Sequence, residues 1–131
     1  MSNEAAKTHV LIIDDDPITL ETASLLLTRS GYTVSVLVGG GHRLDTVAAL
    51  RPDVILLDVN MPVVSGDELL ESLGADPRLS EVPVVYFSSN DEQMLRQLVR
   101  STGAAGYVSK SEMAMGFGAR LSRIMALSAQ A

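Results

Sequence analysis

Short runs of apolar residues alternate along the chain with longer segments in which apolar residues recur at helical spacing. The short runs are rich in β-branched residues and predict five strands, and the periodic segments predict five helices. The predicted strands are His9 to Ile13, Thr33 to Val38, Val54 to Leu57, Val82 to Phe87 and Ala105 to Val108. The predicted helices cover Ile18 to Leu27, Leu44 to Leu50, Leu69 to Leu73, Met94 to Val99 and Phe117 to Leu127.

The alternation of strand and helix predicts a parallel sheet with helices on both faces, because right-handed crossovers place successive helices over the sheet. The strand runs are continuously apolar, as expected for strands that are buried on both sides. The fold class is therefore α/β, a three-layer doubly wound sandwich. A chain of 131 residues suits a single domain. We expect a flexible N-terminus over residues 1–7, the domain over 8–127 and a C-terminal tail over 128–131.

Composition narrows the range of functions. A formal charge of −6 opposes direct binding to nucleic acid, which needs a clustered basic surface. The chain has no Cys, which excludes disulfides and thiolate metal sites and suits a reducing compartment. No apolar run is long enough to span a bilayer, and the N-terminus does not resemble a signal peptide. We therefore expect a soluble, cytoplasmic protein without nucleic-acid or membrane partners.

Chemically active side chains follow four of the five predicted strands. Ligands of open parallel sheets bind at the carboxyl ends of the strands, so these side chains are expected to converge. An acidic run alone would more simply cap the following helix. The conjunction of carboxylates, a hydroxyl and a lysine favours a functional site. These residues are Asp14, Asp15 and Asp16 after the first strand, Asp58 after the third, Ser88 after the fourth and Lys110 after the fifth.

This combination of groups predicts phosphoryl-transfer chemistry. Clustered carboxylates repel one another unless a cation neutralises them, and oxygen ligands that leave room for phosphate favour Mg²⁺. A carboxylate such as Asp58 can attack phosphorus and form an acyl phosphate. We expect Asp58 to be ionised at neutral pH, so that it needs no general base. Lys110 and the Ser88 hydroxyl are suited to contact phosphoryl oxygens.

Three motifs resemble those of two-component receiver domains. They are IIDDDP at 12–17, LLDVNMP at 56–62 with Gly66, and GYVSK at 106–110. The resemblance extends over nearly the whole chain and implies a flavodoxin-like sheet of order 2-1-3-4-5. It also implies that Asp58 receives its phosphoryl group from a phosphohistidine on a histidine kinase or phosphotransfer protein. Such a protein is a signalling switch and not an enzyme, beyond catalysing its own phosphoryl acceptance and slow self-dephosphorylation.

The resemblance assigns a metal site as well. It implies that Mg²⁺, or Mn²⁺ in its place, is held by Asp15, Asp58 and the backbone carbonyl of Asn60, with Asp14 assisting through water. Asp16 would be peripheral to this site. Asn60 and Asn90 occupy positions that border the phosphoryl group in the family and influence self-dephosphorylation.

The same resemblance implies a switch. Ser88 would be the switch hydroxyl, Lys110 the phosphate contact and Tyr107 the aromatic residue that turns inward on phosphorylation. Two pre-existing states would thereby change in population. The altered face would comprise the fourth helix, fifth strand and fifth helix, which the family uses for partners or dimers. The chain is accordingly expected to be a monomer or a phosphorylation-dependent dimer.

Departures from the family pattern lead to further expectations. Ser111 follows Lys110 where the family usually has proline, so we expect a trans peptide there, since a cis bond without proline costs about 2.5–4 kcal/mol. Gly116 and Gly118 would each weaken a helix by about 1 kcal/mol, so the last helix is expected either to start late or to be mobile. His9 and His42 are interpreted as ordinary polar residues.

Two other functions remain open at this point. Asp14-Asp15-Asp16 also resembles the start of haloacid-dehalogenase-like phosphatases, in which Asp14 would be the nucleophile. That family needs a further acidic motif late in the chain, where only Glu112 follows Lys110. A pseudo-receiver would keep the fold without phosphorylation, but such proteins commonly lose an acid, the hydroxyl or the lysine. If the chain is complete at residue 131, we expect its output to be a protein contact. A receiver cut from a hybrid kinase or a larger regulator is the alternative that the sequence leaves open.

Overall fold

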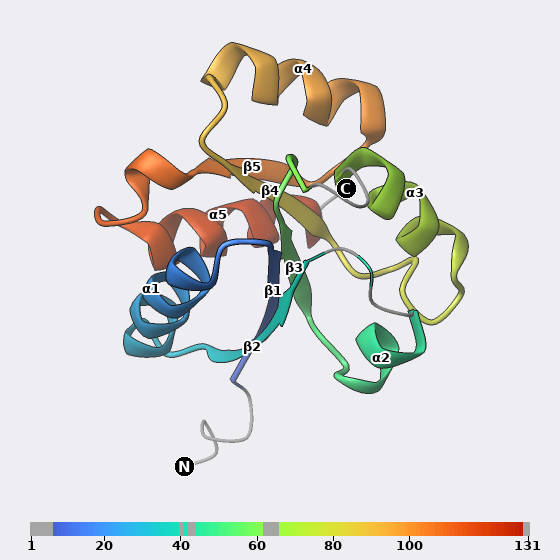
Figure 1. Ribbon diagram of the computed structural model, residues 1–131, viewed down its shortest axis with the longest axis horizontal. Coiled ribbons are helices and arrows are strands. Elements are labelled where there is room, and N and C mark those ends of the chain that lie inside the picture. The colour runs from blue at the N-terminus through green and yellow to red at the C-terminus, as the bar shows by residue number, and fades with distance from the viewer. Residues whose placement is uncertain (1–6, 40, 42–43, 62–65, 130–131) are drawn as a thin grey trace.

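The chain folds as a five-stranded parallel sheet with helices on both faces (Figure 1). The computed structural model describes residues 7–39, 41, 44–61 and 66–129, without the side chains of 66 and 67. The strand order β2-β1-β3-β4-β5 confirms the expected topology. The strands are β1 (His9–Asp14), β2 (Thr33–Val38), β3 (Val54–Leu57), β4 (Val84–Ser88) and β5 (Gly106–Ser109). The helices are α1 (Pro17–Arg29), α2 (Leu44–Ala49), α3 (Gly66–Ala75), α4 (Glu92–Thr102) and α5 (Phe117–Ala129), with a 3₁₀ turn, η2 (Lys110–Glu112).

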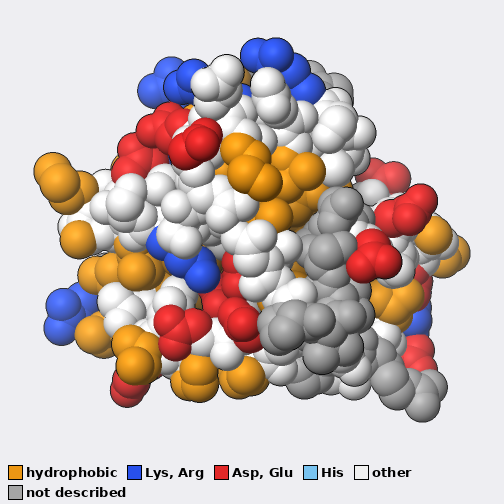
Figure 2. All heavy atoms as spheres, turned by 45° about the horizontal axis from the view of Figure 1, so that its top comes forward, with side chains coloured by type: hydrophobic (Ala, Val, Ile, Leu, Met, Phe, Trp, Pro, Cys, Tyr) orange, Lys and Arg blue, Asp and Glu red, His pale blue; other side chains and the backbone are white. Residues whose placement is uncertain are grey.

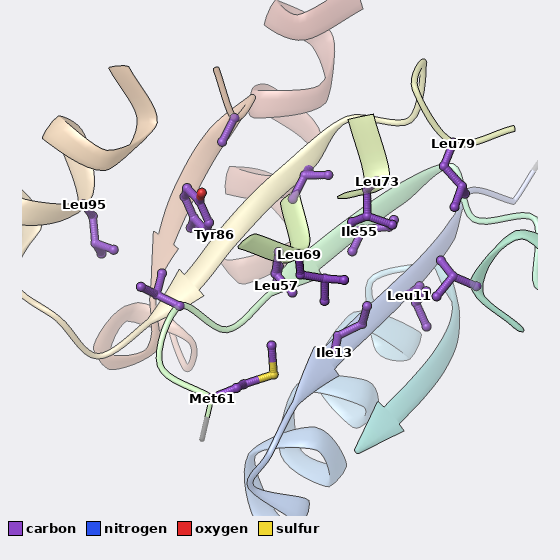
Figure 3. Packing of buried hydrophobic residues seen from close by; sticks show 14 residues of the cluster. Leu11, Ile13, Ile55, Leu57, Met61, Leu69, Leu73, Leu79, Tyr86 and Leu95 are labelled. Atoms are coloured by element: carbon purple, nitrogen blue, oxygen red, sulfur yellow. The ribbon is translucent and has the colours of Figure 1, made fainter. Parts of the chain in front are cut away.

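Successive residues of the strands supply two separate apolar layers. On β1, Leu11 and Ile13 belong to one buried cluster, whereas Val10 and Ile12 belong to the other. This follows from the alternation of side chains along a strand. Helices α2, α3 and α4 cover the first layer, and α1 and α5 cover the second (Figure 1). Figure 3 shows the first layer, in which strand residues meet side chains such as Leu73 of α3.

The strands end at slightly different residues than predicted, and the difference affects two of the predicted site residues. Strands β1 and β4 each continue one residue further than predicted, to Asp14 and Ser88. Both residues are fully buried. Their polar side chains are therefore held by the sheet itself and not by a loop.

His9 acts as a structural residue at the start of β1. Its Nε2 lies 2.7 Å from Ser35 Oγ, and its Nδ1 lies 3.3 Å from the Arg51 carbonyl oxygen. Its backbone N–H donates to Asp53 Oδ2 at 2.7 Å. These contacts fit the ordinary polar role expected for it, while His42 and residues 1–6 lie outside the described residues. Within the described part of the chain, no helix has the length and apolar character needed to cross a bilayer.

The segment after Lys110 follows the expectations drawn from Ser111 and the two glycines. No cis peptide bond occurs among the described residues, so Lys110–Ser111 is trans. Helix α5 begins only at Phe117, directly after Gly116, whose φ of 72° lies in the left-handed region. The late start is therefore confirmed. At its other end α5 continues to Ala129, into the segment expected as a tail.

Gly118 has a packing role that the sequence did not predict. It is buried in the first turn of α5, and a Cβ at this position would collide with the side chain of Ser30 at the end of α1. Tyr32 closes the same contact, because its hydroxyl donates to the Gly118 carbonyl at 3.3 Å and also hydrogen-bonds to Ser122 Oγ. The absence of a side chain at 118 allows α1 and α5 to approach one another.

We expect Gly118→Ala to lower the free energy of unfolding by about 1–3 kcal/mol, because the added methyl group overpacks this contact. Urea unfolding followed by circular dichroism measures the change. Gly74→Ala in α3 is the matched control, since a Cβ there meets no atom within 4 Å. That substitution should instead raise the free energy of unfolding by up to about 1 kcal/mol. A Gly118→Ala protein as stable as the wild type would contradict the packing role.

Candidate functional site

The site lies at the carboxyl ends of β1, β3, β4 and β5. Asp58 directly follows β3, and its backbone N–H donates to the Ile13 carbonyl oxygen on β1 at 2.9 Å. This bond continues the pairing of β1 with β3 and places Asp58 beside Asp14. Both carboxylates are buried, with Asp14 fully enclosed and Asp58 only 4% exposed. The sheet thus brings together two acids far apart in the sequence, as predicted.

The three aspartates that follow β1 have two different roles. Carboxylate oxygens of Asp14, Asp15 and Asp58 lie within 4.8 Å of one another. Asp16 instead caps α1, where its Oδ1 accepts from the Ile18 N–H at 3.1 Å and its Oδ2 from the Thr19 hydroxyl at 2.8 Å. The helix-capping interpretation is therefore right for Asp16, while Asp14 and Asp15 belong to the acidic cluster.

Backbone amides hold the two buried carboxylates in position. The Asn60 N–H donates to Asp58 Oδ1 at 3.1 Å, and the Asp16 N–H donates to Asp14 Oδ1 at 3.0 Å. Each acid thereby accepts a bond from the residue two places further along the chain. One carboxylate oxygen of each acid is engaged in this way, and the other, Oδ2, lies near the Lys110 ammonium group.

Lys110 supplies the cation of the site. Its Nζ lies 2.8 Å from Asp14 Oδ2 and 3.7 Å from Asp58 Oδ2. The side chain passes over the Phe87 ring, with Nζ 5.5 Å from the ring centroid. It is 19% exposed, so its charge acts in a partly desolvated environment. One ammonium group accompanies three carboxylates, so the cluster retains excess negative charge. On the face of the molecule shown in Figure 2, acidic side chains lie next to basic ones.

The electrostatics of Asp58 differ from the expectation. The pKa of Asp58 is raised from 3.8 to about 7, chiefly by burial and also by the neighbouring Asp14 charge, against the lowering effects of the Asn60 N–H and Lys110. Without a bound cation, the carboxyl is only partly ionised at neutral pH. The expectation that it is simply ionised is therefore wrong, because the sequence does not reveal its burial.

The donor set fits a small hard cation. All available side-chain ligands are carboxylate oxygens, and two of the three acids are buried. Mg²⁺ prefers such oxygen ligands and commonly uses few carboxylates, leaving positions for water and phosphate. A divalent cation would also offset the charge that Lys110 leaves uncompensated and favour the ionised form of Asp58.

Ser88 and two asparagines border the cluster. The buried Ser88 hydroxyl accepts from the Asn90 N–H at 3.1 Å. Asn60 Nδ2 in turn donates to Asn90 Oδ1 at 2.6 Å. The sequence placed Asn60 and Asn90 near the site but did not predict this bridge between the loops that follow β3 and β4.

The family model of the response regulator receiver domain matches residues 10–116. The chain belongs to this family. It is therefore a receiver domain of the two-component type, a family whose general role is that of a phosphorylation-dependent signalling switch. Receiver domains generally bind Mg²⁺ and take phosphoryl groups from histidine kinases or phosphotransfer proteins.

Individual relatives agree with this assignment. The chain is 32% identical over 107 residues to the DNA-binding response regulator MtrA of Mycolicibacterium smegmatis, covering 82% of this chain and 46% of MtrA. It is 35% identical over 106 residues to the transcriptional regulatory protein CseB of Streptomyces coelicolor, covering 81% of this chain and 44% of CseB. The chain thus spans slightly less than half the length of these relatives.

The fold is shared with solved receiver structures. The chemotaxis response regulator CheY4 of Vibrio cholerae superposes with a TM-score of 0.75 at 24% identity, covering 90% of this chain and 98% of CheY4. A receiver domain of a signal transduction histidine kinase from Syntrophus aciditrophicus gives the same TM-score at 26% identity, covering 91% of this chain and 90% of that domain.

Tyr107 of β5 contacts α4 through its hydroxyl. Its hydroxyl donates to Glu92 Oε1 at 2.9 Å and accepts from Arg96 Nε at 3.2 Å. The Arg120 guanidinium lies 5.1 Å from the ring centroid and donates to the Tyr107 carbonyl oxygen at 3.1 Å. Sequence reasoning missed all three partners. The spacing of Glu92 and Arg96 is typical of an ion pair on a helix, but it does not indicate that Tyr107 lies beside them.

Proposed function

We propose that Asp58 accepts a phosphoryl group from a phosphohistidine of a histidine kinase or phosphotransfer protein, and that the acyl phosphate alters a protein-binding face. One observation carries this proposal. The Asp58 carboxylate is buried beside Asp14 and Asp15, with its Oδ2 at 3.7 Å from Lys110 Nζ. A phosphoryl group on Asp58 would therefore lie among a cation and the acids suited to a metal.

The chemistry needs few protein groups. A carboxylate oxygen of Asp58 attacks phosphorus, the P–N bond of the phosphohistidine breaks, and its electron pair returns to the donor imidazole. We propose that Asp15, Asp58 and the Asn60 carbonyl hold Mg²⁺ directly and that Asp14 does so through water. Bound Mg²⁺ would offset the negative charge that opposes the attack. Lys110 pairs with a phosphoryl oxygen and keeps the new charge compensated.

Asp14 is poorly suited to be the nucleophile of a phosphatase-like reaction. It is fully buried, and its Oδ1 accepts from the Asp16 N–H at 3.0 Å. Its Oδ2 lies 2.8 Å from Lys110 Nζ. Asp14 Oδ2 is thus held in the closer ion pair, since Asp58 Oδ2 lies 3.7 Å from the same ammonium group. This difference supports Asp58 as the acceptor and Asp14 as a supporting acid.

The positions of Ser88 and Tyr107 support a proposed switch. We propose that the Ser88 hydroxyl moves to a phosphoryl oxygen and gives up its bond from the Asn90 N–H. The movement of Ser88 would reach Tyr107 through the direct pairing of β4 with β5. In this pairing Tyr86 lies opposite Tyr107 and Ser88 lies opposite Ser109. An inward turn of the Tyr107 ring would break its bonds to Glu92 and Arg96. The face formed by α4, β5 and α5 would then change shape.

Intact mass spectrometry after incubation with acetyl phosphate tests the proposal. We expect one phosphoryl adduct in the presence of Mg²⁺ and none when the metal is chelated, because the repulsion between the acids is then uncompensated. Circular dichroism and Mg²⁺ titration of the same sample show whether it is folded and binds the cation. No adduct in a folded, Mg²⁺-binding protein would contradict the proposal and favour a pseudo-receiver.

A further inference from the structure

Strand β2 forms one edge of the sheet and carries no charged residue. It lies outside β1 in the strand order, with α1 toward one face and α2 toward the other (Figure 1). Its six residues, Thr33–Val38, include no proline and pair with β1 in one unbroken register. Proteins commonly protect edge strands with a charge, a proline or a bulge. The strand at the other edge, β5, has only four residues and lies beside Arg96 and Arg120.

The backbone of β2 directs alternate hydrogen-bonding groups away from the sheet. The Thr33 N–H donates to the Thr8 carbonyl oxygen at 2.9 Å, and the Gly39 N–H, just beyond the other end of the strand, also donates to β1. In a parallel pair, every second residue directs its N–H and C=O toward the neighbouring strand. The odd-numbered residues of β2 therefore face β1, and the backbone groups of Val34 and Val36 face outward. No hydrogen bond links these outward groups to another described residue.

An apolar groove lies beside this edge, between β2 and α1. Its volume is about 600 Å³. Three large apolar side chains that line it are exposed, Leu25 by 51%, Val36 by 42% and Val38 by 53%. Val34 packs against the buried layer beneath α1, and the alternation of side chains places Val36 and Val38 on this same face of the sheet. The edge thus combines outward backbone groups with exposed apolar surface.

Two residues of α1 carry opposite charges at opposite ends of this surface. Glu21 lines the groove, and Arg29 is the last residue of α1. Because α1 connects two parallel strands, it runs antiparallel to β2, so Glu21 lies toward the end of β2 and Arg29 toward its start. Both side chains are exposed, and neither forms an ion pair with a described residue. A two-fold axis that paired this surface with itself would bring Glu21 of each copy toward Arg29 of the other.

We propose that β2 pairs antiparallel with β2 of a second copy of this chain, which gives a symmetric dimer with one continuous sheet. The outward backbone groups of Val34 and Val36 would bond across the two-fold axis, as in other cases of strand addition. The apolar side chains of the two grooves would pack together, with a Glu21–Arg29 pair at each end. A second copy is the favoured occupant because the uncharged strand meets itself without repulsion, while α1 supplies both signs of charge.

This dimer is distinct from any phosphorylation-dependent dimer formed through α4, β5 and α5. Strands β2 and β5 lie at opposite edges of the sheet, so one surface leaves the other accessible. The residues of the β2 surface take no part in the proposed switch, so self-association should not require a phosphoryl group. A strand of six residues is about 20 Å long, which makes the interface small. We therefore expect a weak dimer, with a dissociation constant on the order of 10–100 µM.

Sedimentation equilibrium with a chelator and no phosphoryl donor, over about 5–500 µM protein, tests the proposal. We expect a reversible dimer in the wild type and equally in Asp58→Asn. Val36→Lys should raise the dissociation constant at least about tenfold, because it places a positive charge from each copy within the interface. Leu127→Lys is the matched control, since it makes the same change at an exposed position of α5 and should leave the constant unchanged. Circular dichroism shows whether the variants are folded.

An exchange of charges tests the antiparallel arrangement. Glu21→Arg and Arg29→Glu should each raise the dissociation constant about three- to tenfold, because each brings like charges together at both ends of the interface. The double variant restores opposite charges and should recover the wild-type constant within about twofold. Amide chemical shifts of the wild type provide a test without substitution. Those of Val34 and Val36 should change as the protein concentration rises, whereas that of Tyr107 at the opposite edge should not.

Four outcomes would overturn the proposal. They are a wild-type protein that stays monomeric up to about 500 µM, equal effects of Val36→Lys and Leu127→Lys, a double charge variant as weak as the single ones, and a dimer that forms only after acetyl phosphate treatment. Val36→Lys should still form the phosphoryl adduct, because Val36 lies outside the acidic cluster. The test of the dimer is therefore separate from that of the receiver chemistry.

Discussion

Asp58→Asn is expected to abolish the phosphoryl adduct that the wild-type receiver forms with Mg²⁺ and acetyl phosphate. The amide keeps the size of the side chain and its contact with the Asn60 N–H, but it lacks the anionic oxygen that attacks phosphorus. Intact mass spectrometry of both proteins under the same conditions measures the difference. The expected change is complete loss, because Oδ2 of the other buried acid of the cluster, Asp14, is held in a 2.8 Å ion pair with Lys110.

Asp16→Asn provides the matched control for this prediction. Asp16 stands two residues from Asp14 but directs its carboxylate to Ile18 and Thr19 at the start of α1. Asparagine caps helices about as well as aspartate, so this variant should fold and form the adduct. A persistent adduct in Asp58→Asn, or its loss in Asp16→Asn alone, would place the acceptor elsewhere.

The second large effect concerns stability in the absence of Mg²⁺. The folded protein raises the pKa of Asp58 from 3.8 to about 7, chiefly by burial. Between these two values the unfolded chain has lost a proton that the folded chain still holds, so the free energy of unfolding falls as the pH rises through this window. Above the pKa that Asp58 has in the folded protein, the total decrease in the free energy of unfolding is on the order of 4 kcal/mol.

Asp58→Asn should remove this decrease. At about pH 8 with a chelator, we expect its free energy of unfolding to exceed that of the wild type by about 2–4 kcal/mol, and the difference should shrink toward about pH 4. Adding Mg²⁺ should stabilise the wild type more than the variant, because the cation binds only the folded acidic cluster. Urea unfolding across this pH range measures both effects.

Asp16→Asn again serves as the control, because the pKa of Asp16 is shifted in the opposite direction to that of Asp58. The Thr19 hydroxyl and the Ile18 N–H lower the pKa of Asp16, so its contribution is lost as the pH falls. Its substitution should therefore give no stabilisation at high pH. A wild-type protein whose stability does not decline between about pH 4 and pH 8 would show that Asp58 is better solvated than its burial indicates.

The arrangement of strands and helices was largely predictable. Apolar periodicity located all five strands and all five helices, with errors of a few residues at their ends. The buried strands are continuously apolar, and this local property does not depend on long-range contacts. The Asp16-Pro17 pair predicted the start of α1, and Gly116 predicted the late start of α5.

Two properties of the structure could not be read from the sequence. The pKa of Asp58 depends on its burial beside Asp14, which comes from the pairing of β1 with β3. The contact of Gly118 with Ser30 depends on how closely α5 approaches α1. Each is set by residues distant in sequence.

The sequence by itself determined the fold class, the positions of the acids, hydroxyl and lysine at the strand ends, and the family to which the receiver belongs. These follow from short-range periodicity and from motifs whose residues are close together in the chain. Only the tertiary structure decided the burial of Asp58 beside Asp14 and the partners of Tyr107. Solvation and Coulomb interactions depend on distances between side chains that only packing of the sheet and helices establishes.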